Sequence, residues 1–310
     1  MKILFMGTPD YAAECLKALI AHPNVEIIGA VTQPDRQKGR GMKLLPPPVK
    51  VTAEENSIPV FQPTTMKDRA FEETLQSLAP ELIIVAAYGK ILPRYILDYP
   101  KYGCINAHAS LLPRHRGAAP INRAIMEGDT LTGVTSMYMA DGIDTGDMIL
   151  KIEVPIEECD NAGTLHDKLA AAAGEAMCLT VDRLIDGTIT RTPQSEDGMT
   201  YAAKITQTDC PVDFNAPARR VYDHIRSLAP VPCALTHTPD GKLLKITSAE
   251  LCNSKNGDTP GRVVSLDGGI TVACADGCVK ITGVIPEGKG RMSAADYVRG
   301  RKIAIDDILS

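Results

Sequence analysis

The sequence predicts an α/β protein with a mostly parallel, doubly wound sheet, followed by a small β-barrel. The chain has 310 residues, about twice the usual size of one domain, which indicates two domains. In the first two hundred residues, short apolar runs alternate with helical patterns, as in a parallel sheet covered by helices. After residue 204, short strands separated by glycine-containing turns replace this alternation, which indicates a barrel such as the oligonucleotide-binding (OB) fold.

The expected strands of the first part are short runs rich in apolar and β-branched residues. Leu82–Ala87 is apolar on both faces, which is typical of a central parallel strand. In the expected helices, Pro120 suits a first turn, and Thr164 is a candidate N-cap. The strands are expected at residues 1–6, Val25–Thr32, Leu82–Ala87, Gly103–His108 and Gly133–Met139, and the helices at Tyr11–Ala21, Ala119–Glu127 and Thr164–Asp186.

The segment Gly187–Lys204, rich in Thr, Gln and Ser, is expected to connect the two domains. One helix, Arg219–Ala229, should open the second part. Turn signals such as Asp267-Gly268-Gly269 separate the strands that follow. These strands are expected at Ala234–Thr238, Leu243–Leu251, Gly261–Leu266, Ile270–Ala273 and Val279–Pro286.

Composition excludes several classes of protein. A net charge of −5 and a pI near 5.7 argue against an indiscriminate nucleic-acid binder. No apolar run approaches the roughly 20 residues that span a bilayer, and a strand expected from the first residues leaves no room for a signal peptide. The nine cysteines lack paired spacing, so we expect reduced thiols, a cytoplasmic location and no metal site.

An amide, an imidazole and a carboxylate form the candidate active site. Asn106 and His108 lie two apart in an expected strand and should share a face. The apolar turn Ser110–Pro113 follows, because proline cannot continue the strand. Asp141, Asp144 and Asp147 follow another strand. Their spacing does not suit an EF-hand, and it does not tell which of the three acts. Such residue types suit acyl transfer to an amine.

Three other segments have both a functional and an ordinary interpretation. Gly7-Thr8-Pro9-Asp10 lacks the glycine spacing of a dinucleotide site, so we expect a tight turn capped by Thr8 or Asp10. The basic segment 34–43 is either a solvated loop or a finger that binds phosphate. The segment 114–117, Arg-His-Arg-Gly, is either a solvated edge or an anion contact beside the site.

Several of these segments together resemble the formyltransferases that use 10-formyltetrahydrofolate. The resemblance rests on Asn106-x-His108, Ser110–Pro113, the segment 116–121 and Asp141-Gly142-x-Asp144-Thr145-Gly146. Three further segments narrow it to the branch that formylates initiator methionyl-tRNA for translation initiation: residues 7–9, 32–36 and Gly39-Arg40-Gly41. The resemblance covers essentially the whole chain. It implies a Rossmann-like catalytic domain (1–188), a linker (189–206) and an OB-like, tRNA-supporting domain (207–310).

The resemblance also implies roles for individual residues. Asn106, His108 and Asp144 match the catalytic triad, and no metal is implied. The folate site would include Ser110, Leu111, Leu112 and Pro113, with Lys90, Ile91 and Leu92 beside the pterin. Arg40 would probe the acceptor end of the tRNA, together with the neighbouring Arg36, Lys38 and Lys43. The expected partners are therefore folate and initiator methionyl-tRNA, with no membrane contact, for a monomeric enzyme.

The expected reaction is direct attack of the methionine α-amine on the formyl carbon, through a tetrahedral intermediate. Asn106 and a protonated His108 would stabilise the oxyanion, while Asp144 would orient His108 and accept a proton. Formylation of glycinamide ribonucleotide or of a nucleotide-linked amino sugar, hydrolysis of formylfolate, and RNA binding without catalysis are the alternatives. The chain departs from the family in lacking tryptophan: Phe214 follows Asp213, and Val231 stands between two prolines, where the family usually has tryptophan.

Overall fold

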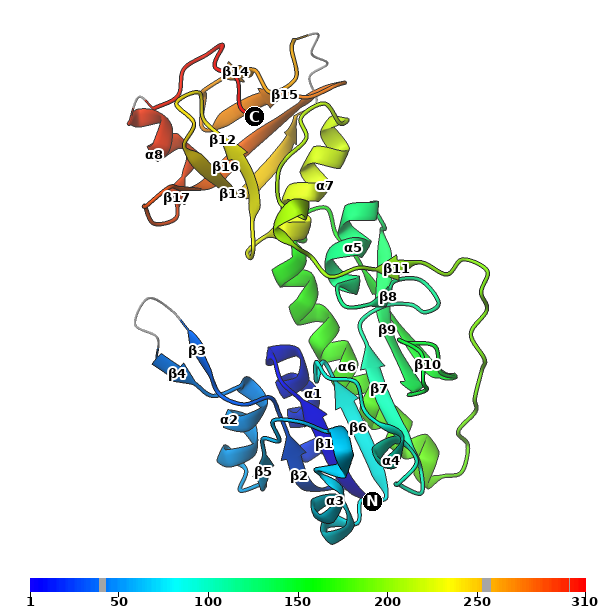
Figure 1. Cartoon of the computed structure of the whole chain (residues 1–310). Helices are drawn as coiled ribbons and strands as arrows, with labels where there is room; N and C mark the ends of the chain where they lie inside the picture. The colour runs from blue at the N-terminus through cyan, green and yellow to red at the C-terminus, as the bar shows by residue number, and fades with distance from the viewer. Residues whose placement is uncertain (39–42, 253–257, 301) are drawn as a thin grey trace. The chain divides into compact units, whose positions relative to one another are not determined.

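The computed structural model describes residues 1–38, 43–252, 258–300 and 302–310 (Figure 1). These residues form two compact units. The N-terminal unit consists of residues 1–117, 131–155 and 166–202, and the C-terminal unit of residues 118–130, 156–165 and 203–310. Among the described residues, no helix is both long enough and apolar enough to cross a membrane.

A seven-stranded sheet forms the centre of the N-terminal unit, in the order β10-β9-β7-β6-β1-β2-β5. Strands β5, β2, β1, β6 and β7 are parallel, whereas β9 and β10 run antiparallel to their neighbours. The expected mostly parallel, Rossmann-like sheet is thus confirmed. The strands are β1 (Lys2–Gly7), β2 (Glu26–Val31), β5 (Val60–Phe61), β6 (Leu82–Ala86), β7 (Cys104–His108), β9 (Leu131–Tyr138) and β10 (Met148–Pro155).

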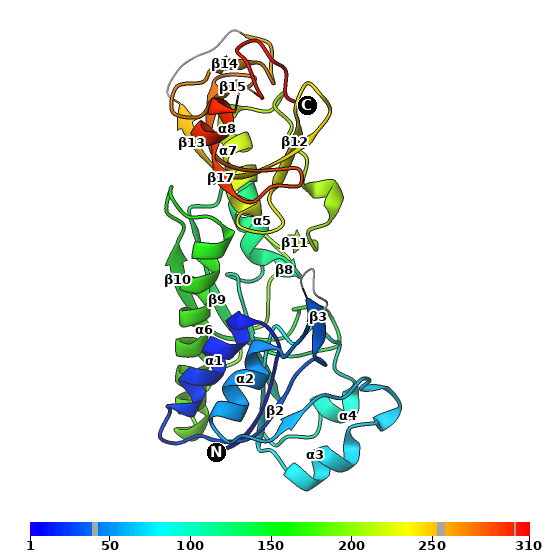
Figure 2. The same ribbon diagram turned by 90° about the vertical axis from the view of Figure 1, so that its left-hand side faces the viewer.

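Helices cover both faces of this sheet, which makes it doubly wound (Figures 1 and 2). On one face, α1 packs closely against α6, because Gly174 has no side chain to separate them: a Cβ there would lie 2.7 Å from Cβ of Ala18. On the other face, α3 and α4 bury Leu75 and Ile96 against the strands. The helices of this part are α1 (Asp10–Ile20), α2 (Pro48–Glu55), η1 (Lys67–Arg69), α3 (Glu72–Leu78), α4 (Arg94–Leu97) and α6 (Ala162–Ile185).

Two helix starts differ from expectation. Asn161, not Thr164, caps α6: its side-chain oxygen accepts from the backbone N–H groups of Gly163 and Thr164, at 2.8 and 3.1 Å. Thr164 lies inside the first turn and returns a bond by accepting from the N–H of Asn161. Helix α1 follows Pro9 without a side-chain cap, so neither Thr8 nor Asp10 caps it. The expected start of α6 is therefore wrong by three residues. In the capping box, Asn161 takes the N-cap position expected for Thr164, and Thr164 takes the position three residues later.

The C-terminal unit is built on a curled antiparallel sheet in the order β12-β13-β16-β15-β14, with β17 paired to β16. Helix α7 packs its apolar face, including Val221 and Ile225, on this sheet. Phe214 belongs to the same core, so phenylalanine fills a buried position there. The OB-like fold class is thus confirmed. Its elements are α5 (Pro120–Glu127), η2 (Gln207–Asp209), α7 (Ala218–Leu228), β12 (Ala234–His237), β13 (Leu243–Cys252), β14 (Val263–Ser265), β15 (Ile270–Ala273), β16 (Cys278–Pro286), β17 (Met292–Ser293) and α8 (Ala294–Arg299).

A buried ion cluster fixes α7 within the C-terminal unit. Asp223 is 1% exposed and accepts from Nε of Arg219 at 2.7 Å and from Nε of Arg226 at 2.8 Å. The Arg226 guanidinium also donates to the carbonyls of Glu157 and Asp160, both at 3.0 Å. A buried charge of this kind is tolerable only while its partners remain, because desolvation otherwise costs several kcal/mol.

Replacing Asp223 should therefore destabilise the protein strongly. We expect Asp223→Asn to lower the free energy of unfolding by about 3–5 kcal/mol, because it removes the carboxylate that pairs directly with the buried Arg226 guanidinium. Urea unfolding followed by far-UV circular dichroism measures this change. Arg299→Gln, which removes an exposed partner of Asp296 in the same unit, is the control and should leave the midpoint almost unchanged. Equal stability of D223N and the control would contradict this assignment.

Candidate active site

Asn106 and His108 project from the same face of β7 near its carboxyl end, as the alternation of a strand requires. His108 is 5% exposed, whereas Asn106 is partly exposed. Within the described part of the chain, no hydrogen bond reaches the Asn106 side chain. Its amide is therefore available to a ligand at the end of the strand.

Both ring nitrogens of His108 face oxygen atoms. Nε2 lies 2.9 Å from the carbonyl oxygen of His115, and Nδ1 lies 3.4 Å from Oδ2 of Asp144. A carbonyl oxygen can only accept, so Nε2 carries the hydrogen of this bond. His115 is itself buried and adopts a left-handed backbone conformation, with φ of +60°. The imidazole is thus held in one orientation from two sides.

Asp144 reaches His108 by a route that the sequence did not indicate. Because β9 runs antiparallel to β7, the loop after β9 begins beside Cys104, at the amino end of β7. The loop then returns toward His108, with Asp144 in a left-handed conformation (φ +53°). Its Oδ2 accepts from the N–H of Gly117 at 2.8 Å. Asp141 instead pairs with exposed Arg94, so of these two aspartates only Asp144 faces the imidazole.

The turn Ser110–Pro113 follows β7 at its carboxyl end, as expected, and is rigidly held. Ser110 and Leu112 are fully buried. The Ser110 hydroxyl donates to the carbonyl of Arg114 at 2.7 Å, and Thr135 bonds the backbone of both Ser110 and Leu112. Leu111 and Pro113 remain partly exposed and form the accessible surface of the turn.

Residues 90–92 have three different environments. The Lys90 ammonium donates to the carbonyls of Pro63 and Thr64, at 2.8 and 2.9 Å. Partial burial, with a smaller effect of the Arg36 charge, lowers the pKa of Lys90. Ile91 is 86% exposed, whereas Leu92 is 4% exposed and belongs to the core beneath β6.

Strands β1, β2 and β6 end beside one another in a small polar network. The Thr8 hydroxyl and the Gln33 amide both donate to the carbonyl of Tyr88, at 3.0 and 3.1 Å. Burial raises the pKa of Tyr88 to about 12. The connection from β1 leads to β2, whereas the connection from the adjacent β6 leads to β7 on the other side, and in doubly wound sheets such a switch point is the usual site of ligand binding.

The basic segment is a two-stranded ribbon rather than an irregular loop. Strand β3 (Arg36–Lys38) pairs antiparallel with β4 (Lys43–Leu45), and Lys38 is opposite Lys43 in the register. Arg36 is exposed. Arg40 lies outside the described residues.

The connecting segment contributes to the site, which the sequence did not indicate. Its residues Tyr201 and Ala202 form β11, which pairs with β8 (Arg116–Gly117) (Figure 1). The pairing is so close that a Cβ at Gly117 (φ +119°) would lie 2.8 Å from the carbonyl oxygen of Ala202. The N–H of His115 donates to Oγ1 of Thr200 at 2.9 Å. No local motif marks these contacts, because they join residues 85 positions apart in the chain.

Within the segment 114–117, Arg114 is exposed, whereas Arg116 differs from both interpretations of the segment. Arg116 is 2% exposed and donates to Oε1 of Gln194 at 2.9 Å, with Glu196 as a second partner at 3.3 Å. It is a buried link between β8 and the connecting segment, and not a solvated edge or an anion contact.

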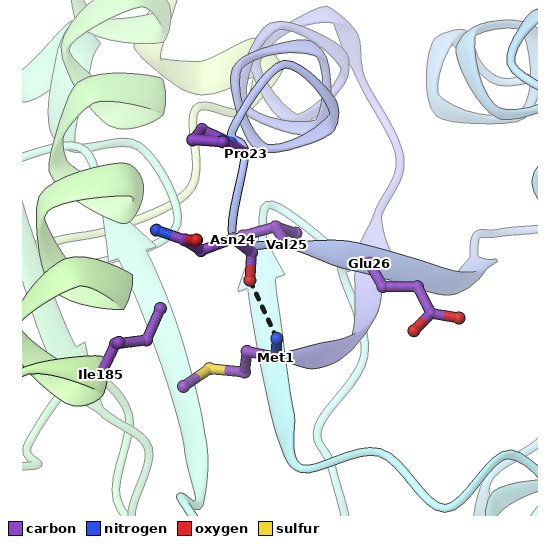
Figure 3. Close-up of a pocket in the computed structure, with 6 residues that line it drawn as sticks. All are labelled: Met1, Pro23, Asn24, Val25, Glu26 and Ile185. Atoms are coloured by element: carbon purple, nitrogen blue, oxygen red, sulfur yellow. Dashed lines mark hydrogen bonds between the residues drawn. The ribbon is translucent and has the colours of Figure 1, made fainter.

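A surface pocket lies at the other end of the sheet, at the amino ends of β1 and β2 (Figure 3). The N-terminal ammonium of Met1 donates there to the carbonyl of Asn24 at 2.8 Å. His108 and Asn106 lie at the carboxyl end of β7, so this pocket takes no part in the candidate site.

An ion pair fixes the base of the β3–β4 ribbon. The Lys50 ammonium of α2 contacts both carboxylate oxygens of Asp35, at 3.0 and 2.9 Å. Gln62 donates to Asp35 and to the carbonyl of Gln33, both at 2.8 Å. The Gln62 hydrogen bond, followed by the bond from Lys50, lowers the pKa of Asp35. The ribbon therefore begins from a fixed point.

Comparison with known proteins places this site in a family. Residues 1–181 match the family model described as formyl transferase, and residues 204–302 match the formyl transferase C-terminal domain. The class defined by fold and site is therefore that of the formyl-group transferases.

Sequence relatives show to which family within this class the chain belongs. The chain is 48% identical to the methionyl-tRNA formyltransferase of Bacillus licheniformis over 301 residues, which are 96% of this chain and 95% of that protein. It is 46% identical to the methionyl-tRNA formyltransferase of Geobacillus thermodenitrificans, over 96% of this chain and 93% of that protein. The chain belongs to the methionyl-tRNA formyltransferase family.

Solved structures share the fold at lower identity. An N-formyltransferase from Helicobacter canadensis, in complex with folinic acid and dTDP-3-aminofucose, has a TM-score of 0.68 and 19% identity, with 91% of this chain and 98% of that chain covered. HypX from Aquifex aeolicus, in complex with tetrahydrofolic acid, has a TM-score of 0.64 and 19% identity over 97% of this chain. The chain spans about half the length of HypX (47%).

Because the pKa of Asp35 is lowered, its ion pair predicts that the stability of the fold decreases at acidic pH. A carboxyl with a lowered pKa stabilises the fold above its ordinary value of about 3.9, and this contribution is lost as the pH falls through the lowered value. We expect Lys50→Met to raise the pKa of Asp35, so that the contribution is lost at a higher pH. Carboxyl ¹³C NMR titration measures the pKa. Lys17→Met, which removes a lysine on α1, is the control; an unshifted Asp35 in K50M would refute the assignment.

Proposed function

We propose that the chain transfers the formyl group of 10-formyltetrahydrofolate to the α-amine of methionine on initiator methionyl-tRNA, for translation initiation. The observation that supports this proposal most directly is that His108, Asp144 and the available amide of Asn106 lie together at the end of β7. Membership of the methionyl-tRNA formyltransferase family supports the choice of acceptor.

In the proposed reaction, the neutral α-amine attacks the formyl carbon directly and gives a tetrahedral intermediate. The intermediate then collapses as the bond between this carbon and N10 of the folate breaks. N10 takes up the proton that the amine loses and leaves as tetrahydrofolate, and the formyl group stays on the α-amine. An α-amine titrates near pH 7.7–8.0, so its neutral form is accessible near neutrality. Asn106 donates its free amide hydrogen to the developing oxyanion. Asp144 orients His108 and accepts a proton from the amine, directly or through water.

His108 has one constraint in this mechanism. Its Nε2–H donates to the His115 carbonyl. To act as a second oxyanion donor, it must share that hydrogen between the His115 carbonyl and the formyl oxygen. When both ring nitrogens are protonated, the Nδ1–H donates to the Asp144 carboxylate, and the Nε2–H donates to both the His115 carbonyl and the formyl oxygen.

We propose that the folate binds along the turn Ser110–Pro113 and beside residues Lys90–Leu92. The available amide of Asn106 fits a formyl oxygen, and the accessible surfaces of Leu111, Pro113 and Ile91 fit the face of a flat heteroaromatic ring. The buried Ser110, Leu112 and Leu92 would support this wall from behind. The tetrahydrofolic acid in the HypX complex supports a folate-type donor.

For the tRNA, we propose that Arg36, Lys38, Arg40 and Lys43 contact the acceptor end. The fixed base of the β3–β4 ribbon supports this role. The proposed division is a catalytic domain (1–188), a linker (189–206) and a tRNA-supporting domain (207–310). We further propose a cytoplasmic monomer that makes no contact with membranes.

The test is formyl transfer from 10-formyltetrahydrofolate to initiator methionyl-tRNA, with elongator methionyl-tRNA and glycinamide ribonucleotide as competing acceptors. Formylation of the initiator alone supports the proposal. Transfer only to the small acceptor, or to none, overturns the tRNA assignment.

The two aspartates of one loop provide a matched pair for the catalytic role. We expect Asp144→Asn to lower kcat by about 10²-fold or more, because an amide cannot accept the amine proton. Asparagine tolerates the left-handed backbone of this position, so the loop should keep its shape. Asp141→Asn, in the same loop but paired with Arg94, should stay within twofold of the unchanged enzyme. Steady-state kinetics compares the two, and equal activities would exclude the assigned role.

Charge removal on the ribbon should weaken tRNA binding. For Arg36→Gln we expect a weaker affinity for tRNA and a shallower slope of log Kd against log[salt], by about 0.7–0.9 for one phosphate that is no longer neutralised. Filter binding across a salt series measures the slope. Lys101→Gln, an exposed lysine on another loop, should leave it unchanged. An unaltered slope in R36Q would remove Arg36 from the residues that bind tRNA.

A further inference from the structure

Gln194 of the connecting segment contacts the loop that carries Asp144. Its Nε2 donates to the carbonyl of Asp144 at 2.8 Å and to the carbonyl of Gly146 at 2.9 Å. These carbonyls lie on either side of Thr145, just after the left-handed turn at Asp144 (φ +53°). A non-glycine residue keeps such a conformation only when its surroundings fix it. Gln194 supplies two of the bonds that do so.

The other end of the same amide is also engaged. Oε1 of Gln194 accepts from Nε of Arg116 at 2.9 Å, and Arg116 is 2% exposed. The next residue, Gly117, donates its N–H to Oδ2 of Asp144 at 2.8 Å. The Gln194 side chain therefore links two segments. One is the backbone at Asp144 and Gly146, and the other is Arg116–Gly117, in which the Gly117 N–H binds the Asp144 carboxylate.

The chemistry of the contact requires a carboxamide. A glutamine can donate two hydrogens and accept one bond at the same time, which is what this position uses. A glutamate would turn a negative charge toward two carbonyl oxygens, and a methionine would fill the volume without any of the three bonds. The amide, and not the bulk of the side chain, is the part that acts.

We infer that Gln194 is a positioning residue for formyl transfer, which holds the Asp144 carboxylate in register with the His108 imidazole. This inference rests on the proposed function of Asp144 and His108. The segment that follows α6 is accordingly part of the site's framework. Gln194 itself acts through Asp144.

The test compares Gln194→Met with Glu196→Gln. Glu196 lies two residues away, is exposed and also pairs with Arg116, but has no bond to the Asp144 loop among the described residues. We expect Q194M to lower kcat by about 10–100-fold, because a misplacement of about 1 Å in a catalytic arrangement can cost up to about 10²-fold, with KM for both substrates within twofold. E196Q should keep full activity.

A spectroscopic readout separates positioning from general stability. The imidazole ¹⁵N shifts of His108, measured at one pH, should change in Q194M and D144N but not in E196Q. Gln194→Glu, of the same shape, should show the same loss as Q194M if the methionine variant folds poorly. An E196Q defect as large as that of Q194M, or unchanged His108 shifts in a folded Q194M and Q194E, overturns the inference.

The two proposals can fail separately. If the unchanged enzyme formylates no methionyl-tRNA, the proposed function fails, while the ¹⁵N shifts still decide whether Gln194 positions Asp144. If the unchanged enzyme is active and the Gln194 variants match it, the positioning role fails and the proposed function stands.

Discussion

A buried imidazole needs a hydrogen-bonding partner for each of its two nitrogens. At His108, this requirement determines the conformation of the loops around the ring. The partners are the His115 carbonyl and the Asp144 carboxylate, from two different loops. Both residues adopt left-handed backbone conformations, which are costly for side chains with a Cβ. Each loop is then fixed by contacts to the connecting segment: Thr200 for His115, and Gln194 for the Asp144 loop. The site is thus an arrangement of backbone groups as much as of side chains.

The part of this arrangement that depends on local pattern could be predicted from the sequence. The two-residue spacing of Asn106 and His108 determines their common face in a strand, because side chains alternate. The choice among Asp141, Asp144 and Asp147 depends on how the loop returns from an antiparallel strand, and no local pattern encodes that return. The resemblance to a family pointed to Asp144, and in the structure its carboxylate lies 3.4 Å from the His108 ring.

The contacts of the connecting segment could not be predicted for a similar reason. A stretch rich in Thr, Gln and Ser has the composition of a solvated linker, and Gln194 differs from any surface glutamine only by its partners in the fold. The ribbon β3–β4 is likewise too short for a periodic signal, with three residues in each strand. In the C-terminal unit, by contrast, turn residues separate the strands clearly, and the expected strands agree with the observed ones to within about two residues.

The close approach of Gly117 to the Ala202 carbonyl limits where the chain can be cut or joined. A fragment that stopped at the end of α6 would contain Asn106, His108 and Asp144, but it would lack the strand that covers Gly117 and the hydroxyl that holds His115. Such a fragment would expose the buried guanidinium of Arg116 to water. Any chimaera should therefore keep the chain as far as Ala202 with the first unit, whose last segment ends there.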